Sequence, residues 1–276
     1  MARTKVMVLT GCASGIGCHL ARVLAEDGHR LVCTDINIDA LEACAEANGW
    51  DHSKVLVRKL DVRQPLEWKQ TLDEAVKRFG RIDVLMNVAG YLRPGYVHKI
   101  SPGEVDMHMD VNVKGTIFGT QAAAAQMVKQ GSGHIINVGS LASLAPVAGL
   151  SLYSASKFAV RGFTLAVAQE LREHGVYVTL VLPDAVETPM LDLQADFEEA
   201  ALTFSGTAPL TLKDIEEVIL DNVLKNRPLE VTLPFGRGAL ARLATCLPDV
   251  SMWVAPVLRK KGIAAQQRLK DKLRDR

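Results

Sequence analysis

The sequence predicts an α/β protein in which a doubly wound, seven-stranded parallel sheet is covered by helices on both faces. Short apolar runs alternate along the chain with longer segments of helical periodicity, which is the order that parallel βαβ units require. Hydrophobic residues make up 48% of the 276 residues and aromatic residues only 5%. The core must therefore consist mainly of aliphatic side chains, as in sheets buried on both faces.

Each expected strand is a short apolar run, and each expected helix is a longer segment with apolar residues three or four positions apart. The strands cover residues 6–9, 31–34, 55–60, 84–88, 134–138, 176–181 and 229–233. The helices cover residues 16–27, 39–47, 66–79, 102–129, 152–174 and 212–226. This alternation predicts one domain over residues 1–234, built from crossovers between parallel strands.

Two segments fall outside this alternation. Residues 184–210 form a long connection, rich in Ala, Leu, Met and Phe, of the kind that serves as a lid or a binding loop. Residues 235–276 form a C-terminal extension that is apolar from Leu240 to Leu258 and basic beyond it. Segment 259–276 holds eight Lys and Arg against two Asp and Glu, a net +6, which leaves about −5 for the rest of a chain whose formal net charge is +1.

The C-terminal extension has two interpretations. Its apolar and basic parts together could rest on an anionic membrane surface. Alternatively, the apolar part covers a subunit or the binding site, and the basic part is solvated. The second interpretation is favoured because Pro248 and Pro256 are expected to interrupt a long helix.

Charge and cysteine content narrow the class of protein. A formal net charge of +1 argues against a general nucleic-acid binder. The five cysteines are odd in number and show no CxxC spacing, so neither a disulfide framework nor a zinc or other metal site is expected. They are Cys12, Cys18, Cys33, Cys44 and Cys246. The sequence shows no signal peptide and no apolar run of 18 residues, so a reducing, cytoplasmic location is expected.

A glycine-rich segment links the first expected strand to the first expected helix. It runs Thr10-Gly11-Cys12-Ala13-Ser14-Gly15-Ile16-Gly17. Gly11 permits a tight turn, Gly15 lets the backbone approach a pyrophosphate, and Gly17 lets the helix lie close to the strand. The helix N-terminus offers free N–H groups to the phosphates. A bare glycine turn is the alternative, but the strand before it and the helix after it favour a dinucleotide site.

Asp35 closes the second expected strand, 18 residues after Gly17. A carboxylate there can accept hydrogen bonds from an adenosine ribose and would repel a 2′-phosphate. No Lys or Arg stands at positions 12–14, 34, 36 or 37 to attract such a phosphate. NAD is therefore expected rather than NADP, with helix capping by Asp35 as the alternative.

Tyr153 and Lys157 are spaced four residues apart in an expected helix, so they share one face of it. A nearby ammonium favours the phenolate and is expected to lower the pKa of Tyr153 from about 10 toward the working range. Tyr153 could then remove a hydroxyl proton while hydride leaves the carbon, or return the proton during reduction. By itself, this spacing is more often a contact on the surface of a helix than a catalytic pair.

Two further polar residues support the chemical interpretation. Ser140 follows the strand over residues 134–138, at the carboxyl edge where ligands bind in open α/β sheets, and its hydroxyl could bond the substrate oxygen. The alternative is a polar loop serine. Asn112 is a poor mid-helix residue, which indicates a local irregularity or a specific hydrogen bond. It could hold a water that connects Lys157 to solvent, or be polar incidentally.

With these residues in place, the sequence resembles the classical short-chain dehydrogenase/reductase (SDR) family. The TGxxxGxG loop of that family matches Thr10 to Gly17, and its Asn-Asn-Ala-Gly motif appears as Asn87-Val88-Ala89-Gly90. Its catalytic Asn, Ser, Tyr and Lys fall on Asn112, Ser140, Tyr153 and Lys157. These motifs span residues 5 to about 190.

The resemblance implies a single Rossmann-type domain, and a homodimer or homotetramer packed through the helices over 102–129 and 152–174. It also implies cofactor contacts beyond the glycine loop and Asp35. These fall on Asp61, Val62, Asn87, Ala89, Gly90, Tyr153, Lys157, Pro183 and Thr188. In the family the lysine also binds the nicotinamide ribose, and a threonine at the place of Thr188 contacts the carboxamide.

Two departures from the family pattern stand out. Val88 replaces the second Asn of the motif, which costs a polar contact but not the turn. Asp184 follows Pro183 where the family usually has Gly, so a side chain there is expected to narrow the nicotinamide pocket or alter the loop.

Apolar residues around these motifs indicate a hydrophobic substrate. The expected pocket residues are Leu144, Leu150, Met190 and Leu191, with Ala145, Pro146, Leu193 and Phe197 nearby. Packing of the loop against the core is the alternative.

Together the residues predict an oxidoreductase that moves hydride between NAD(H) and a secondary alcohol or ketone. The expected substrate is a lipophilic small molecule. Two alternatives stay open: a carbonyl (3-oxoacyl-like) reductase of the NADPH type in the same fold, and a non-catalytic NAD-binding sensor.

Overall fold

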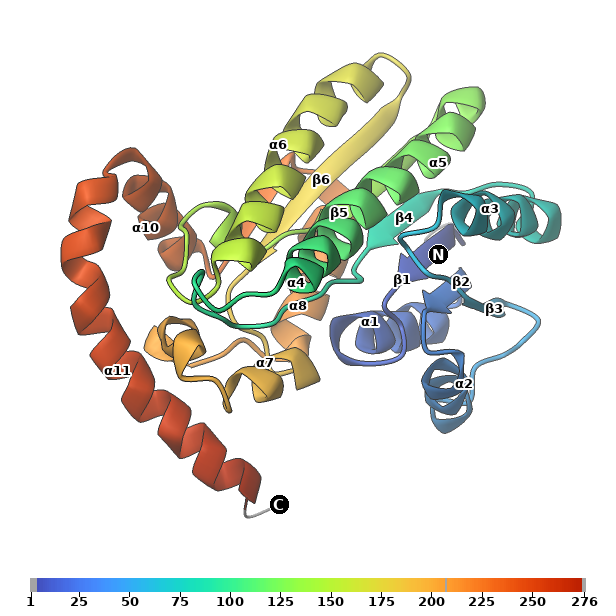
Figure 1. Ribbon diagram of the computed structural model, residues 1–276. Helices are drawn as coiled ribbons and strands as arrows, with labels where there is room; N and C mark the ends of the chain where they lie inside the picture. Colours follow the sequence, from blue (N-terminus) through green and yellow to red (C-terminus); the bar gives the residue numbers. More distant parts are fainter. Residues whose placement is uncertain (1–3, 207, 275–276) are drawn as a thin grey trace.

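The computed structural model describes residues 4–206 and 208–274 and confirms the expected architecture. Seven parallel strands form one sheet in the order β3-β2-β1-β4-β5-β6-β7 (Figure 1). The strands are β1 (Val6–Thr10), β2 (Arg30–Asp35), β3 (Val55–Lys59), β4 (Val84–Asn87), β5 (Gly133–Val138), β6 (Val176–Pro183) and β7 (Glu230–Leu233). The strand order reverses between β1 and β4, and ligands bind at the carboxyl ends of the strands beside such a reversal.

Helices cover both faces of the sheet (Figure 1). The face that carries Met7 and Leu9 packs against α1 (Gly15–Glu26), α2 (Ile38–Ala47) and α8 (Leu212–Val218). The opposite face, which carries Val8, packs against α3 (Pro65–Phe79), α5 (Gly115–Gln130) and α6 (Ser151–Arg172). Alternate residues of one strand thus contribute to two separate cores.

The expected helix over residues 102–129 contains an irregular turn. α4 (Pro102–Met107) passes into a π-helical turn, His108–Lys114, before α5 begins. Asn112 lies in this turn, as the presence of Asn in mid-helix suggests. A second π-helical turn, Ile219–Val223, joins α8 to the short α9 (Leu224–Asn226).

The long connection and the C-terminal extension both contain helices. Residues 184–210 include α7 (Pro189–Gln194) and a run of 3₁₀ turns, Glu198–Ser205. The extension forms α10 (Phe235–Cys246) and α11 (Pro248–Arg274). In Figure 1, α11 is a long rod at one side of the molecule, next to the segment that contains α7.

The expectation that prolines interrupt this extension is wrong for Pro256, because α11 continues through it. Pro248 opens the helix, where proline is favoured. Pro256 removes the N–H that would bond the carbonyl of Met252. Pro256 and Met252 are both exposed. Water can therefore bond the Met252 carbonyl in place of the missing N–H, and the helix persists.

The inner side of α11 is fixed to the long connection by contacts that leave little freedom. A Cβ at Gly262 would overlap the carbonyl oxygen of Ala201. The side chain of Gln266 is buried and donates to the carbonyl oxygens of Gln194 and Phe197 at 2.9 and 2.6 Å. α11 therefore packs closely against the connection.

One disulfide departs from what the cysteine spacing predicts. Cys18 of α1 and Cys44 of α2 are joined by a disulfide, with their Cα atoms 6.9 Å apart. The two helices lie on the same face of the sheet, which brings together residues separated by 26 positions. A count of cysteines and their spacing cannot show such a pairing. Cys12, Cys33 and Cys246 are free.

Thr10 ties the first strand to the segment after β4. Its buried hydroxyl oxygen accepts hydrogen bonds from the backbone N–H groups of Val88 and Ala89, both at 3.0 Å. This link holds the carboxyl ends of β1 and β4 at a fixed distance from each other.

We predict that Thr10→Val lowers the free energy of unfolding by about 1–3 kcal/mol, because two N–H groups lose their acceptor. Thr34, paired with Thr10 in the sheet, is the matched control, since its hydroxyl makes one bond, to the Leu9 carbonyl at 2.9 Å. Urea denaturation of both variants is the measurement. An equal or larger loss in Thr34→Val would contradict this role for Thr10.

Candidate functional site

A cavity of about 750 Å³ opens at the carboxyl edge of the sheet. It is lined by residues that end or follow β1, β4, β5 and β6, including Thr10, Gly90, Ser140 and Pro183. The strand order reverses at this edge, which is the place where a doubly wound sheet binds its ligand. Residues from distant parts of the chain therefore converge on one site.

The glycine loop forms one wall of the cavity, lined by Gly11, Ser14, Gly15, Ile16 and Gly17. A Cβ at Gly17 would overlap the Gly11 carbonyl oxygen, so this position requires glycine for close packing of α1. Gly15 has a φ of +52°, and a Cβ there would lie 3.2 Å from Cγ2 of Thr188. The loop is therefore packed between the start of α1 and the segment after β6.

The start of α1 suits an anionic ligand. Within the described chain, the side chain of Ser14 makes no capping hydrogen bond to the helix. The first N–H groups of a helix have no partner within it, and they carry a partial positive charge. These groups border the cavity, so this site fits the diphosphate of a dinucleotide.

Asp35 lies at the end of β2, on the same wall of the cavity. Its Oδ2 accepts from the N–H of Ala13 at 3.0 Å, and its Oδ1 accepts from the N–H of Asn37 at 2.9 Å. These two bonds fix the carboxylate beside the glycine loop. Each carboxylate oxygen can accept a further bond, so ribose hydroxyl groups can still be bound.

Asp61 and Val62 also line the cavity, as the family resemblance implies. The structure adds Arg63, which the sequence did not single out and which also lines it. The guanidinium of Arg63 makes three bonds to the Asp61 carboxylate at 2.7–3.1 Å. These bonds lower the pKa of Asp61. Arg63 is thus neutralised by its neighbour, and the spacing Asp-x-Arg was the available sequence signal.

Asn87 lies behind the cavity rather than on its wall. Its buried amide donates to Oδ1 of Asn137 at 2.8 Å and to Oγ1 of Thr120 at 3.3 Å. Asn137 in turn donates to Oγ1 of Thr164 at 3.0 Å. This buried chain of polar groups links β4, β5, α5 and α6. The residues that follow, Val88, Ala89 and Gly90, do line the cavity.

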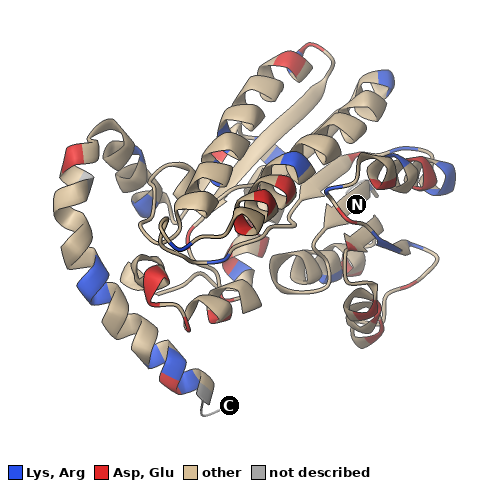
Figure 2. Ribbon diagram, in the orientation of Figure 1, with Lys and Arg blue, Asp and Glu red and all other residues tan. Residues whose placement is uncertain are grey.

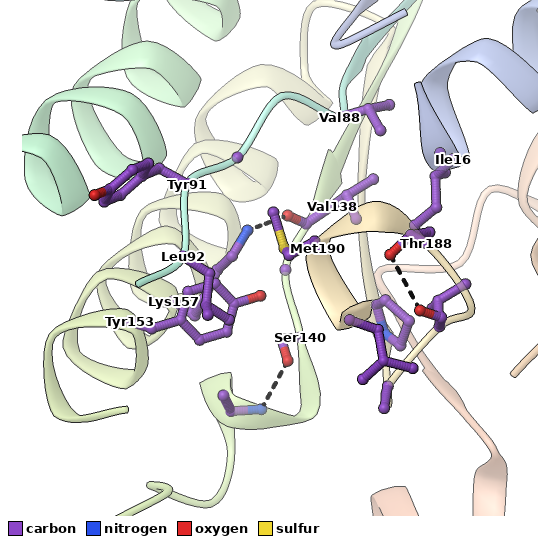
Figure 3. Close-up of a pocket in the computed structure, with 18 of the residues that line it drawn as sticks. Ile16, Val88, Tyr91, Leu92, Val138, Ser140, Tyr153, Lys157, Thr188 and Met190 are labelled. Carbon is purple, nitrogen blue, oxygen red and sulfur yellow. Dashed lines mark hydrogen bonds between the residues drawn. The ribbon is translucent and has the colours of Figure 1, made fainter. Parts of the chain in front are cut away.

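Tyr153 and Lys157 extend from α6 into the cavity, and both are buried (Figure 3). In Figure 3 the Tyr153 hydroxyl points toward the open centre of the site, near Met190. The Nζ atom of Lys157 donates to the carbonyl of Val138 at 2.9 Å and lies 5.6 Å from the centroid of the Tyr153 ring. The two side chains are therefore adjacent, one helical turn apart.

The expected fall in the pKa of Tyr153 is wrong for this structure. Burial raises the pKa of Tyr153 to about 12, and a hydrogen bond with Ser140 opposes that rise. Burial also lowers the pKa of Lys157 to about 8. Desolvation disfavours the charged form of each group, and the ammonium is directed to the Val138 carbonyl rather than to the phenol oxygen. At neutral pH the phenol is therefore protonated.

Ser140 lies below Tyr153 in the same cavity (Figure 3). Its Oγ accepts a hydrogen bond from the N–H of Ala142 at 3.1 Å, as the first residue of a short 3₁₀ turn. This bond fixes the oxygen, while the hydroxyl proton is left to be donated. The group can donate either to the phenol oxygen of Tyr153 or to the oxygen of a bound molecule.

Asn112 is buried next to these residues, and both the oxygen and the nitrogen of its side-chain amide are hydrogen-bonded within the protein. Its Oδ1 accepts from the N–H of Tyr91 at 2.7 Å, and its Nδ2 donates to the Tyr91 carbonyl at 2.8 Å. Nδ2 also donates to Oγ of Ser156 at 2.9 Å. Asn112 therefore fixes the segment after Gly90 to α6, which positions the wall of the cavity that faces Lys157.

The far end of the cavity is apolar. Leu150, Met190 and Leu191 line it as expected. Leu144 does not: it packs against Val160, Leu180 and Leu182 in the core beneath the site. The structure adds apolar lining residues that the sequence did not indicate: Leu92, Val147, Leu202, Leu240, Ala241, Ala244 and Leu258. Four of these belong to the C-terminal extension, which therefore covers part of the site.

Asp184, where the family usually has Gly, forms an ion pair with Arg237 of α10. The distance from its Oδ2 to the guanidinium Nε is 2.7 Å, and both residues line the cavity. Burial raises the pKa of Asp184, and the charge of Arg237 opposes this rise. Asp184 thus links the end of β6 to the C-terminal extension. Thr188, on the same segment, lines the cavity at the N-cap position of α7, and its hydroxyl donates to the Val186 carbonyl at 3.1 Å.

The described residues contain neither a metal-binding cluster nor a helix that could span a membrane. No group of three or more His, Cys, Asp or Glu side chains is arranged to hold a metal ion. No helix in that part of the chain is long and apolar enough to cross a membrane.

Comparison with known proteins agrees with the fold. A family model described as short chain dehydrogenase matches residues 5–199. The chain belongs to this family, and it is an oxidoreductase of the SDR class.

Three similar proteins illustrate the family. An uncharacterised oxidoreductase of Staphylococcus saprophyticus is 37% identical over 196 residues, 70% of this chain and 79% of its own length. The (2S)-[(R)-hydroxy(phenyl)methyl]succinyl-CoA dehydrogenase subunit of Thauera aromatica is 36% identical over 190 residues, 69% of this chain and 76% of its own. A Burkholderia phymatum SDR, solved in complex with NAD, superposes with a TM-score of 0.80 at 25% identity, covering 90% of this chain and 95% of that one.

Lys157 gives a prediction about stability and pH. Its folded-state pKa of about 8 lies below the ordinary 10.5, so between these values the unfolded chain holds a proton that the folded chain has lost. The free energy of unfolding therefore rises as the pH rises from about 8 to 10.5. Below pH 8 the folded protein carries the full destabilising cost of the buried Lys157 charge. Lys157→Met removes that cost.

We expect Lys157→Met to be more stable than the wild type at pH 7 by up to about 3 kcal/mol, and this difference to shrink by roughly 2 kcal/mol at pH 10. Urea denaturation at both pH values is the measurement. Lys157→Arg, which keeps its charge throughout, should instead fall behind the wild type as the pH rises. If the difference in unfolding free energy between Lys157→Met and the wild type does not change with pH, Lys157 is not a buried group that loses its proton in this range.

Proposed function

We propose that this protein is an NAD-dependent oxidoreductase that interconverts a secondary alcohol and a ketone on a lipophilic small molecule, with Tyr153 as the general acid and base. The observation that carries the proposal is the convergence of Tyr153, Ser140 and Lys157 on a cavity whose opposite wall is the glycine loop with Asp35. Bound nicotinamide dinucleotide would supply or accept the hydride.

Each residue of the proposed catalytic group has a separate task. Ser140 donates its free hydroxyl proton to the substrate oxygen, since its acceptor side is held by Ala142. Tyr153 gives a proton to that oxygen as a ketone is reduced, and takes it back as an alcohol is oxidised. Lys157 binds the ribose next to the nicotinamide and, as an ammonium, favours the phenolate when Tyr153 loses its proton. Asn112 holds the wall that faces Lys157.

The raised pKa of Tyr153, about 12, favours one direction of this reaction. A protonated phenol is ready to donate at neutral pH, so ketone reduction needs no prior change at Tyr153. Oxidation requires a base at the same position and is favoured at higher pH. This observation supports a carbonyl reductase as the second candidate, acting through the same residues.

The preference for NAD over NADP rests on Asp35. Its carboxylate is fixed beside the glycine loop, where it can bind ribose hydroxyl groups and would repel a 2′-phosphate. The nearby Arg63 is engaged by Asp61 and so offers no free cation to such a phosphate. A relative solved with NAD, the Burkholderia phymatum protein, is consistent with this preference.

A lipophilic substrate is proposed because the end of the cavity beyond Tyr153 is lined by aliphatic side chains, including Leu150, Met190, Leu191 and Leu202. An apolar substrate group that binds against such a wall is stabilised by about 25 cal/mol for each Å² of apolar surface removed from water. The Thauera aromatica relative is named for a substrate with a phenyl group, which also fits an apolar site.

We also propose a homodimer or homotetramer formed through α4, α5 and α6. α5 and α6 lie next to each other on one face of the sheet (Figure 1), and the SDR family commonly packs its subunits through these helices. The small-molecule site described above lies at the carboxyl edge of the sheet rather than on this face.

Tyr153→Phe tests the mechanism. We expect kcat to fall by about 10²- to 10⁴-fold, because the general acid and base is lost, while NADH still binds, as followed by its fluorescence. Secondary alcohols that range from small polyols to long apolar chains serve as substrates, and we expect the wild type to prefer the apolar ones.

Tyr91→Phe is the matched control for Tyr153→Phe, since the Tyr91 hydroxyl points away from Tyr153 (Figure 3). Unchanged turnover in Tyr153→Phe would refute the mechanism.

Asp35→Asn tests the cofactor preference. We expect kcat/KM with NAD⁺ to fall about 10-fold or more, since charged bonds to the ribose are lost, and the gap between NAD⁺ and NADP⁺ to narrow. Asp39→Asn makes the same change of charge at an exposed position on α2 and should leave the preference unaltered. If Asp35→Asn leaves the ratio of the two kcat/KM values at its wild-type level, Asp35 does not select the cofactor.

A further inference from the structure

The C-terminal extension presents an apolar surface to solvent. Trp253 is 85% exposed, Met252 72% and Val257 69%. The other large apolar side chains exposed on α10 and α11 are Phe235, Leu240, Leu243, Val250, Val254, Leu258 and Ile263, with Leu247 between the two helices. Such a concentration of exposed apolar side chains on one segment is unusual on the surface of a monomer.

The apolar surface continues into a basic one along the same side of α11. Val250, Val254 and Val257 are spaced three or four residues apart, and Lys261 continues that spacing, so these side chains form one line on the helix. Further along, Arg268 and Lys272 extend the same line, and both are exposed. Figure 2 shows the basic residues gathered in the C-terminal half of α11.

The opposite side of α11 is occupied by its own chain. Gly262 and Gln266 are buried against the 3₁₀ turns and the end of α7. Arg259 donates to the Tyr96 hydroxyl at 2.7 Å, and Lys270 pairs with Asp196 at 3.3 Å. The helix is therefore held with its apolar and basic line facing outward, and within the described chain nothing covers that line.

We propose that the outward side of α10 and α11 is a docking surface for an anionic lipid bilayer. Apolar side chains of the first half, with Trp253 among them, would enter the boundary between headgroups and acyl chains. The Lys and Arg side chains of the second half would lie against anionic headgroups, which attract them electrostatically. Because α11 continues through Pro256, its apolar half and its basic half belong to one helix.

A second copy of the chain fits this surface less well. If two α11 helices pair in parallel, their basic halves face each other and repel. If they pair in antiparallel fashion, Lys and Arg of one copy cover Trp253 and Val257 of the other, which leaves the charges without partners. An anionic bilayer satisfies both halves together.

Docking in this manner places the cavity beside the bilayer. Leu240 of α10 and Leu258 of α11 are partly exposed and also line the cavity. A lipophilic molecule dissolved in the bilayer would then reach the site along the same apolar side chains. The docking itself does not depend on the proposed reaction, and binding can be measured without turnover.

Co-sedimentation of the intact protein with vesicles tests the proposal, using phosphatidylcholine alone and phosphatidylcholine with 30% phosphatidylglycerol at low salt. We expect binding to the anionic vesicles, weakened by salt. The double variant Trp253→Glu with Val257→Glu should bind at least 10-fold more weakly. Lys260→Glu with Lys261→Glu should lose the preference for anionic lipid. Leu66→Glu, at a 66% exposed apolar residue of α3, which lies across the molecule from α11 (Figure 1), is the control.

Intrinsic fluorescence provides a second readout, because Trp253 is exposed whereas Trp50 and Trp68 are buried. A blue shift on adding anionic vesicles, absent in Trp253→Phe, is expected. Failure of the intact chain to bind anionic vesicles would overturn the proposal. So would equal weakening of vesicle binding in Leu66→Glu. If light scattering instead shows that the Trp253 and Val257 double variant dissociates an oligomer and no vesicle binding occurs, the surface is a contact between copies.

Discussion

The burial of Tyr153 and Lys157 beside an apolar cavity is the constraint on which the rest of the site depends. Burial away from solvent disfavours the charged form of each side chain. The Tyr153 phenol therefore retains its proton more strongly than in water, and the Lys157 ammonium loses its proton more easily. The fold tolerates this cost because the pair lies on one face of α6, directly above the carboxyl ends of β4 and β5. A proton donor is thereby held where a polarised oxygen can be bound.

The same edge of the sheet is organised by a small number of backbone links. Thr10 ties β1 to the segment after β4, and Asn112 ties that segment to α6. On the other side, Asp184 pairs with Arg237 and connects the end of β6 to α10. The wall that contains the glycine loop and Asp35 is thus built within the first half of the chain. Much of the apolar wall is built by the long connection together with the C-terminal extension.

Most of the fold and of the catalytic group could be predicted because their signals are local. Strand bounds follow from short apolar runs, and the tyrosine and lysine share a helical face through a spacing of four. What could not be predicted depends on three-dimensional neighbours. The Cys18–Cys44 pairing, the core position of Leu144 and the pKa of Tyr153 all depend on packing that spacing does not encode. α11 continues through Pro256 because the helical turn that lacks a hydrogen bond is exposed to solvent, and this exposure cannot be predicted from the sequence.

The most direct test of the central claim is a crystal structure of the protein with NAD⁺. The account predicts that the adenosine ribose lies on the Asp35 carboxylate, that the diphosphate meets the start of α1, and that the Tyr153 hydroxyl faces the nicotinamide beside Ser140. A dinucleotide bound elsewhere, or a Tyr153 hydroxyl turned away from the nicotinamide, would contradict it.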